Sequence, residues 1–342
     1  MLPEKEINQI KEELQTAKRP LFIFDDDPDG LCSFLLFYRF IREGKGVIKK
    51  SSPKVTTAFL RKVEEYNPDK IFILDVPIVE QDFIDAVKVP IIWVDHHEPL
   101  DRYGLKYFNP RKHDPEIYYP ATKICYDVVQ QDLWLAMVGC IGDWHIPDFK
   151  EEFCKKYPDL MDCKINDPGK VAYETRLGSL IKIFSFCLKG KISQVMKMIK
   201  VLTRIENPYE LLEGKTPQAK FILKHTNRIS HAYETMLKEA KKKVGKSIIV
   251  LYKYKEKQWA LSRDLAGEMI HHHPDKIVII GREKSGEVKC SIRSRSVDIR
   301  PIIEKSLQGL EGYGGGHAYA CGAVIKVEDF EQFMKNFKRE LK

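Results

Sequence analysis

Several features of secreted and membrane proteins are missing from this sequence of 342 residues. No apolar run approaches the roughly 20 residues that a membrane-spanning helix needs. No two of the eight cysteines have the C-x-x-C spacing of a structural zinc site. The first residues lack the charged and then apolar pattern of a signal peptide. We therefore expect a cytoplasmic protein that has reduced cysteines and no membrane partner.

The composition is that of an ordinary globular protein, with 43% hydrophobic and 31% charged residues and a net charge of +8. The length allows two domains, each with its own core. The positive charge is uneven, because residues 215–246 contain nine Lys or Arg and only two Glu. Apolar residues at helical spacing predict one long helix over 220–244 that joins two domains. Its basic outer face suits a polyanionic partner, with a simple solvated face as the alternative.

Three buried strands are predicted in the first third of the chain, at 21–24, 71–74 and 90–94. They alternate with predicted helices, which indicates an α/β fold with a doubly wound parallel sheet. Weaker strand patterns occur at Val47 and at 56–60, and residues 146–214 have mainly helical patterns. A second α/β pattern begins near residue 247, with strands over 277–280 and 288–292. We therefore expect a smaller α/β domain at the C-terminal end of the sequence.

Each of the three strands ends in side chains that could bind metal ions. The candidate ligands in chain order are Asp25, Asp27 and Asp29 before Gly30, then Asp75, then Asp95, His96 and His97, and last Asp143. Each motif is weak alone, and the first could be a solvated turn. Together they would meet at one edge of a parallel sheet, where clustered carboxylates need a cation. Mixed Asp and His ligands suit manganese better than calcium, and more than four ligands indicate two ions with a bridging carboxylate.

The ordered motifs resemble the DHH phosphoesterase superfamily, which is named after the triplet Asp95-His96-His97. The segment Gly314-Gly315-Gly316-His317 resembles the signature of the DHH-associated domain of RecJ-like nucleases and nanoRNases. The resemblance covers nearly the whole chain apart from a helical insert around 146–214. It implies a DHH catalytic domain at 1–145, a helical insert with a basic linker helix at 146–245, and a substrate-binding domain at 246–342.

The resemblance also implies roles for individual residues. The implied metal ligands are Asp25, Asp27, Asp29, Asp75, His96 and Asp143, with Asp75 bridging the two ions. His97 would polarise the phosphate, and Asp95 would orient a neighbouring histidine. The implied nucleotide-binding residues are Arg293, Ser294, Gly314, Gly315, Gly316 and His317. The implied cofactor is two Mn²⁺ ions, with Mg²⁺ or Co²⁺ as substitutes. Ile23 replaces a histidine of some relatives, so the first motif is closer to RecJ than to family II pyrophosphatases.

The function that the resemblance implies is an exonuclease that hydrolyses single-stranded DNA or RNA to nucleoside monophosphates. The alternative is a nanoRNase-like hydrolase of short oligonucleotides, 3′-phosphoadenosine 5′-phosphate or cyclic dinucleotides. The basic helix favours the longer substrate. A catalytically silent scaffold is a third interpretation, but such relatives lose motif residues and this chain keeps them. A replication or repair protein and a second copy of the chain are the protein partners that the family suggests.

Other conspicuous residues have weaker functional patterns. His271, His272 and His273 precede Pro274 at the end of a predicted helix, and we interpret them as a helix terminus rather than a metal site. His145 is close in sequence to Asp143. Trp144, Tyr313 and Tyr319 are candidates for stacking on bases, with core packing as the alternative.

Overall fold

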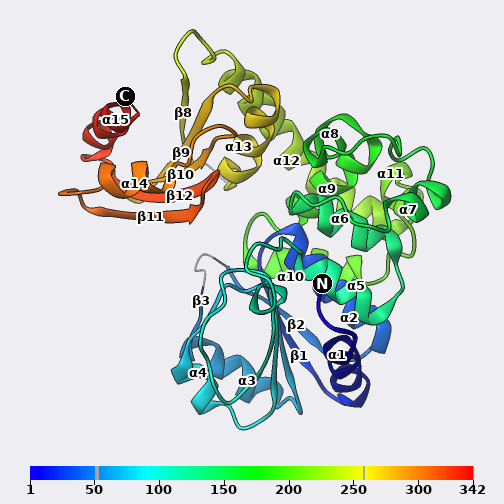
Figure 1. The fold of residues 1–342 in the computed structure, drawn as a ribbon. Helices are drawn as coiled ribbons and strands as arrows, with labels where there is room; N and C mark the ends of the chain where they lie inside the picture. The colour runs from blue at the N-terminus through cyan, green and yellow to red at the C-terminus, as the bar shows by residue number, and fades with distance from the viewer. Residues whose placement is uncertain (51–53, 257–258, 342) are drawn as a thin grey trace. The chain divides into compact units, whose positions relative to one another are not determined.

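The computed structural model describes residues 1–50, 54–256 and 259–341 (Figure 1). The chain forms two compact units, Met1–Leu223 and Lys224–Lys342. The boundary lies within the long helix α12 (Pro217–Lys241), which corresponds to the helix predicted over 220–244. Within the described ranges, no helix combines the length and the apolar character that a membrane span requires.

The first unit is organised around a five-stranded sheet in which all neighbouring strands are parallel, as predicted. The strands in spatial order are β2 (Lys45–Ile48), β1 (Leu21–Phe24), β4 (Ile71–Leu74), β6 (Ile91–Val94) and β7 (Lys106–Phe108). The three central strands are buried along their whole length. Such continuous apolar runs are typical of parallel strands that are covered on both faces. A separate short ribbon pairs β3 (Lys54–Val55) with β5 (Ile78–Val79).

Helices cover both faces of this sheet, which confirms the doubly wound arrangement. One face, with Phe22 and Phe72, packs in a core with α1 (Glu4–Thr16) and α2 (Pro28–Ile41). The same core includes α5 (Ala121–Val129) and α6 (Leu133–Gly142). The other face packs with α3 (Leu60–Tyr66) and α4 (Gln81–Ala86). Figure 1 shows α1 and α2 on the opposite side of the sheet from α3 and α4.

The predicted helical segment belongs to the same core as α2, α5 and α6. Its helices are α7 (Lys150–Lys156), α8 (Pro168–Glu174), α9 (Arg176–Cys187), α10 (Ile192–Leu202) and α11 (Pro208–Glu213). Phe184 of α9 and Leu202 of α10 are fully or almost fully buried in that cluster. The segment is therefore continuous in packing with the helices on one face of the parallel sheet.

The second unit contains a mixed five-stranded sheet. Its strands in spatial order are β11 (Gly312–His317), β12 (Ala320–Lys326), β10 (Glu287–Arg293), β9 (Ile277–Lys284) and β8 (Ile249–Lys255). Only the β8–β9 pair is parallel among these strands. The helices α14 (Arg300–Ser306) and α15 (Phe330–Glu340) share a core with one face, and α13 (Ser262–His272) contacts β9 and β10. The predicted smaller α/β domain is confirmed.

Two local features differ from what the sequence patterns indicate. The weak strand expected at 56–60 is wrong, because Thr57–Phe59 form a 3₁₀ turn and α3 follows directly. The Thr56 side chain accepts a hydrogen bond from the backbone N–H of Ala58, which starts the turn instead of extending the strand. The glycine run is typical of a turn, but it lies in the edge strand β11, where pairing with β12 fixes its backbone.

Candidate active site

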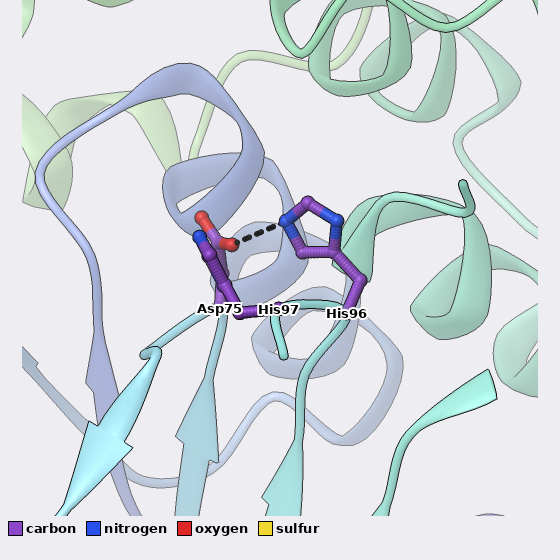
Figure 2. A group of neighbouring side chains, drawn as sticks. All are labelled: Asp75, His96 and His97. Atoms are coloured by element: carbon purple, nitrogen blue, oxygen red, sulfur yellow. Dashed lines mark ion pairs between the residues drawn. The ribbon is translucent and has the colours of Figure 1, made fainter. Parts of the chain in front are cut away.

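The strand ends that carry the predicted ligands are neighbours in the sheet. Asp25 follows β1, Asp75 follows β4, and His96 comes two residues after β6. The pairs Phe24–Leu74 and Leu74–Val94 are in register, so the three strands end at the same level. Figure 2 shows Asp75 and His96 at the ends of their strands, with the His96 ring directed at the Asp75 carboxylate. The sheet therefore brings together residues that are about 70 positions apart in the sequence.

The first aspartate motif forms the turn from β1 into α2. Asp27 is the N-cap of α2, and its carboxylate accepts a hydrogen bond from Gly30 N over 3.1 Å. Pro28 occupies the first helical position, where its missing N–H costs nothing. A Cβ atom on Gly30 would lie 2.7 Å from the backbone nitrogen of Asp25, so only glycine fits there. The sequence thus folds three carboxylates into one tight turn.

Asp29 is held by the N-terminus of α5. Its two carboxylate oxygens accept hydrogen bonds from Ala121 N over 2.9 Å and from Thr122 N over 2.6 Å. The Thr122 hydroxyl donates to the backbone carbonyl of Asp29. Asp29 is 1% exposed, so the start of a helix fixes the orientation of a buried carboxylate.

His96 lies among three of the predicted carboxylate ligands. Its Nε2 atom is 3.2 Å from Asp75 Oδ1, 3.8 Å from Asp29 Oδ2 and 3.6 Å from Asp143 Oδ2. The ring is buried, and its Nδ1 atom has no hydrogen-bond partner among the described residues. Burial lowers the pKa of His96, and the neighbouring His97 adds to this effect. A neutral imidazole facing several carboxylates is the form that coordinates a metal ion.

The donor atoms fall into three groups in which all atoms lie within 4.8 Å of one another. We call Asp25, Asp27 and Asp75 the Asp25 group, and Asp29, His96 and Asp143 the His96 group. The third group contains Asp75, His96 and His97. Asp75 and His96 each belong to two groups, which gives a continuous set of oxygen and nitrogen donors. This set fits divalent transition ions that accept both donor types.

The electrostatics of the cluster also favour a bound cation. Burial raises the pKa of Asp29 to about 7, and the Asp143 carboxylate adds to the shift. Burial likewise raises the pKa of Asp75, and the negative charges of Asp29, Asp27 and Asp25 raise it further. Ionised carboxylates are therefore costly here without a compensating charge, which divalent ions would provide.

His97 differs from His96 in its partner. Its Nδ1 lies 2.8 Å from Asp95 Oδ1, and its backbone N–H donates to Asp95 Oδ2 over 3.1 Å. Burial opposes protonation of the ring, but the fully buried Asp95 carboxylate, together with the charges of Asp143 and Asp25, outweighs burial and raises the pKa of His97 to about 9. His97 is therefore a cationic donor at neutral pH, and Asp95 fixes the orientation of its ring.

Two residues at this edge were not identified from the sequence. Lys49 follows β2, is 4% exposed, and places its Nζ 2.8 Å from Asp25 Oδ1. Tyr118 lies in the loop before α5, and its hydroxyl donates to Asp143 Oδ2 over 2.7 Å. The only sequence signal for Lys49 is its position directly after a weak strand, and Tyr118 has none.

The predicted nucleotide-binding residues lie in the second unit. Arg293 and His317 are both in register with Ala320, on opposite sides of β12. They therefore share one row and one face of the sheet, with backbones about 10 Å apart. Gly315 is on the same face, whereas Gly314 and Gly316 alternate with it. The Ser294 hydroxyl oxygen accepts hydrogen bonds from Ser296 N and Val297 N, so this side chain stabilises a turn.

The remaining candidates differ in exposure. Tyr313 and Tyr319 are 69% and 53% exposed, and Trp144 is 38% exposed. These values leave ring surface for stacking. His145 packs against Tyr119 and is partly buried. His271 and His272 lie in the last turn of α13, and neither belongs to the three donor groups found among the described residues.

Two family models match the chain. The DHH family N-terminal domain matches residues 21–140, and the DHHA1 domain matches residues 245–342. Together they include every candidate ligand except Asp143 and all of the predicted nucleotide-binding residues. No curated protein sequence matches the chain.

Solved structures resemble the fold at low sequence identity. RecJ from Thermus thermophilus in complex with Mn²⁺ matches with a TM-score of 0.70 and 16% identity, over 98% of this chain and 54% of RecJ. Its complex with Mg²⁺ matches with a TM-score of 0.61 and 14% identity, over 98% and 52%. An exonuclease RecJ bound to manganese gives a TM-score of 0.63 and 15% identity, over 98% and 93%. CDC45 from Entamoeba histolytica matches with a TM-score of 0.52 and 9% identity, over 98% of this chain and 98% of CDC45.

This chain thus spans about half the length of the Thermus RecJ. The two family models occur in the order in which the two units follow each other. The chain belongs to the DHH phosphoesterase superfamily, with a DHHA1 domain after the DHH domain.

Proposed function

We propose that this protein is a metal-dependent exonuclease that hydrolyses single-stranded nucleic acid to nucleoside monophosphates. The observation that carries the proposal is the meeting of the Asp25 group and the His96 group at one sheet edge of a DHH-family protein. The cofactor in this proposal is two Mn²⁺ ions, with Mg²⁺ or Co²⁺ as substitutes. Residues 1–145 would carry the catalytic groups, 146–245 the helical segment with its basic helix, and 246–342 the substrate-binding face.

The proposed mechanism assigns separate tasks to the residues at the sheet edge. Asp25, Asp27, Asp29, Asp75, His96 and Asp143 would hold the ions. When bound, such ions polarise a phosphoryl oxygen and lower the pKa of water. His97, kept protonated by Asp95, donates a hydrogen bond to a non-bridging oxygen of the phosphodiester as negative charge grows there. Asp75 belongs to two donor groups, which supports a bridging position between two ions.

The substrate-binding face would hold the terminal nucleotide. Arg293 and His317 lie in one row of the sheet, and both side chains can donate hydrogen bonds to a phosphate. The glycines of β11 allow a ligand to approach the backbone closely. Because β11 is an edge strand, part of its N–H groups point away from the sheet. These features support binding of a phosphate group next to exposed Tyr313.

The basic helix α12 supports a substrate longer than a dinucleotide. Lys224, Arg228, Lys238 and Lys241 are all exposed. Of the acidic residues on this helix, Glu239 accepts a hydrogen bond from the Tyr252 hydroxyl, so it is directed at the sheet. Lys224 and Lys241 are about 26 Å apart along the helix axis, from the rise of a helix per residue. Cations spread over this length of helix can contact the phosphates of several nucleotides.

The proposal is tested with single strands of DNA and RNA labelled at the 5′ or the 3′ end, from 2 to 30 nucleotides long, with Mn²⁺ present. We expect mononucleotides to be released from one end and longer strands to be preferred. Lys224→Glu with Arg228→Glu should raise KM for a 30-mer and leave KM for a dinucleotide unchanged. The matched control is Lys335→Glu with Lys338→Glu, which reverses two charges that are exposed on α15.

Two results would contradict parts of the proposal. Absence of any hydrolysis with Mn²⁺, Mg²⁺ or Co²⁺ would contradict the nuclease activity itself. Cleavage of dinucleotides much faster than longer strands would instead favour the nanoRNase-like alternative, in which α12 has no part in binding.

A further inference from the structure

A buried lysine contacts the proposed metal site. Lys49 directly follows β2, and its backbone N–H donates to Phe24 O over 2.8 Å, which continues the pairing of β2 with β1. This pairing places Lys49 beside Asp25, the residue that directly follows β1. The ammonium nitrogen is 2.8 Å from Asp25 Oδ1, and the two side chains are 5% and 15% exposed.

The neighbouring lysine shows that this placement is specific. The Lys50 ammonium donates to the backbone carbonyls of Leu188 and Gly190, over 2.6 and 3.3 Å. It is 4.0 Å from Asp26, which belongs to none of the three donor groups. Lys49 therefore brings its positive charge to the Asp25 group, whereas Lys50 connects the end of β2 to the end of α9.

The contact occupies one of the two carboxylate oxygens of Asp25. Oδ1 accepts a hydrogen bond from Asp26 N over 2.6 Å in addition to the contact with Lys49. The orientation of the carboxylate is thus fixed from two sides, which leaves Oδ2 as the oxygen without these two contacts. A carboxylate held in this way is positioned before an ion arrives.

The charge of Lys49 also changes what the Asp25 group offers to an ion. Three ionised carboxylates carry a charge of −3, and Lys49 reduces the sum to −2, which a single divalent ion neutralises. A positive charge so close to the ligands also repels the ion, and the repulsion is strong because the site is largely buried. The ion affinity of this group is therefore lower than its three carboxylates alone would give.

We propose that the positive charge of Lys49, which contacts Asp25, lowers the affinity of the Asp25 group for its metal ion. The inference rests on the proposed metal-dependent function. The effect is expected at one of the two ion sites, because Lys49 contacts Asp25, which belongs to the Asp25 group and not to the His96 group. An ion at the Asp25 group would then be exchangeable, whereas an ion at the His96 group would not depend on Lys49.

The test is calorimetric titration of the full-length metal-free protein with Mn²⁺. Lys49→Met should strengthen one binding step by about tenfold or more, equivalent to about 1.4 kcal/mol, and leave the other step unchanged. Lys49→Arg keeps the charge and should behave like the wild type. Lys123→Met is the matched control, because Lys123 is also a buried lysine paired with a carboxylate, but its partners Asp127 and Asp148 are in none of the donor groups.

A purely structural role of Lys49 would give the opposite sign, because a disordered Asp25 binds the ion more weakly. Circular dichroism first checks that the Lys49→Met protein is folded. If the folded variant binds Mn²⁺ as the wild type does or more weakly, the inference is overturned and the proposed function remains intact. Absence of Mn²⁺ binding by the wild type would overturn both. If Lys49→Met fails to fold, the same titration of Lys49→Gln gives the answer, since glutamine removes the charge and retains a hydrogen-bond donor.

Discussion

The hydroxyl of Tyr118 lies 2.7 Å from Asp143 Oδ2 and 2.8 Å from the backbone carbonyl oxygen of the same residue. Oδ2 is also the oxygen that lies 3.6 Å from His96 Nε2. The Tyr118 ring meets the His96 ring edge to face, with centroids 5.6 Å apart. Partial shielding of the hydroxyl from water, together with the charge of Asp143, raises the pKa of Tyr118, so the hydroxyl keeps its proton. Tyr118 thus orients a carboxylate of the His96 group.

Tyr118→Phe should therefore weaken Mn²⁺ binding and turnover by about tenfold to hundredfold, as removal of groups that orient metal ligands commonly does. The measurements are calorimetric titration and initial rates on a labelled oligonucleotide. Tyr119→Phe is the control, because the Tyr119 hydroxyl donates to Asp127, which is in none of the donor groups. Equal effects of the two substitutions would show that Asp143 needs no support from Tyr118.

Asp75→Asn should abolish hydrolysis and raise the Tm of the metal-free protein. Burial raises the pKa of Asp75, so its ionised form is costly when no ion is bound, and an amide removes that cost. Asparagine also tolerates the backbone of this position, which has a φ of 57°. Differential scanning calorimetry in EDTA and rate measurements with Mn²⁺ test both effects. Asp82→Asn, on the exposed start of α4, should change neither, and residual turnover by Asp75→Asn would refute the bridging role.

The stability of the metal-free protein should depend on pH through Asp29. Its pKa is raised from 3.8 to about 7, so the folded state binds this proton more tightly than the unfolded state. The protonated Asp29 makes its full contribution to the free energy of unfolding below pH 3.8. This contribution, up to about 4 kcal/mol, is lost as the pH rises towards 7. We expect the free energy of unfolding in EDTA to fall more steeply between about pH 4.5 and 7 for the wild type than for Asp29→Asn. Parallel urea-denaturation profiles for the two proteins would contradict the shift.

The pair His97–Asp95 should control a second titration. Among the groups that raise this pKa, Asp95 ranks ahead of Asp143 and Asp25, so Asp95→Asn should lower the pKa of His97 from about 9 by more than one pH unit. Nitrogen-15 NMR of the imidazoles in the metal-free protein measures this, with His145 as the internal reference because its ring packs against Tyr118 and Tyr119. Turnover at pH 8 should fall about a hundredfold, since the phosphate loses a charged donor. An unchanged His97 titration would mean that Asp95 does not hold its proton.

The main parts of the fold were predictable because the sequence contains them as uninterrupted patterns. The runs at β1, β4 and β6 are fully buried, so each pattern indicates a parallel strand, and parallel strands place their ends at one edge. The convergence of Asp75 and His96 follows from that geometry alone. The short strand β7 was not predicted, since three residues between loops give no periodic signal.

What the sequence could not provide are contacts made by single side chains across the fold. Lys49 and Tyr118 become relevant only because β2 lies beside β1 and the loop before α5 folds back on α6. The glycine run opposes strand formation by propensity, and it becomes β11 only through its pairing with β12. The surface of the helix α12 was predicted from its periodicity, but the direction of Glu239 toward Tyr252 was not.

Contacts of Arg39 connect the helical segment to α2, one of the helices that cover the parallel sheet. This buried residue of α2 makes a two-pronged contact with Asp132, over 2.7 and 2.9 Å, and donates to Ile205 O over 2.5 Å. Arg39→Met leaves Asp132 and the carbonyl of Ile205 without this partner and should cost about 3–5 kcal/mol in urea unfolding. Arg61→Met removes the exposed pair with Glu65 and should leave stability unchanged within error. If the two variants unfold at the same urea concentration, the buried Arg39 contact stabilises the protein no more than the exposed Arg61–Glu65 pair does. Apolar packing of α9 and α10 alone would then hold this segment in place.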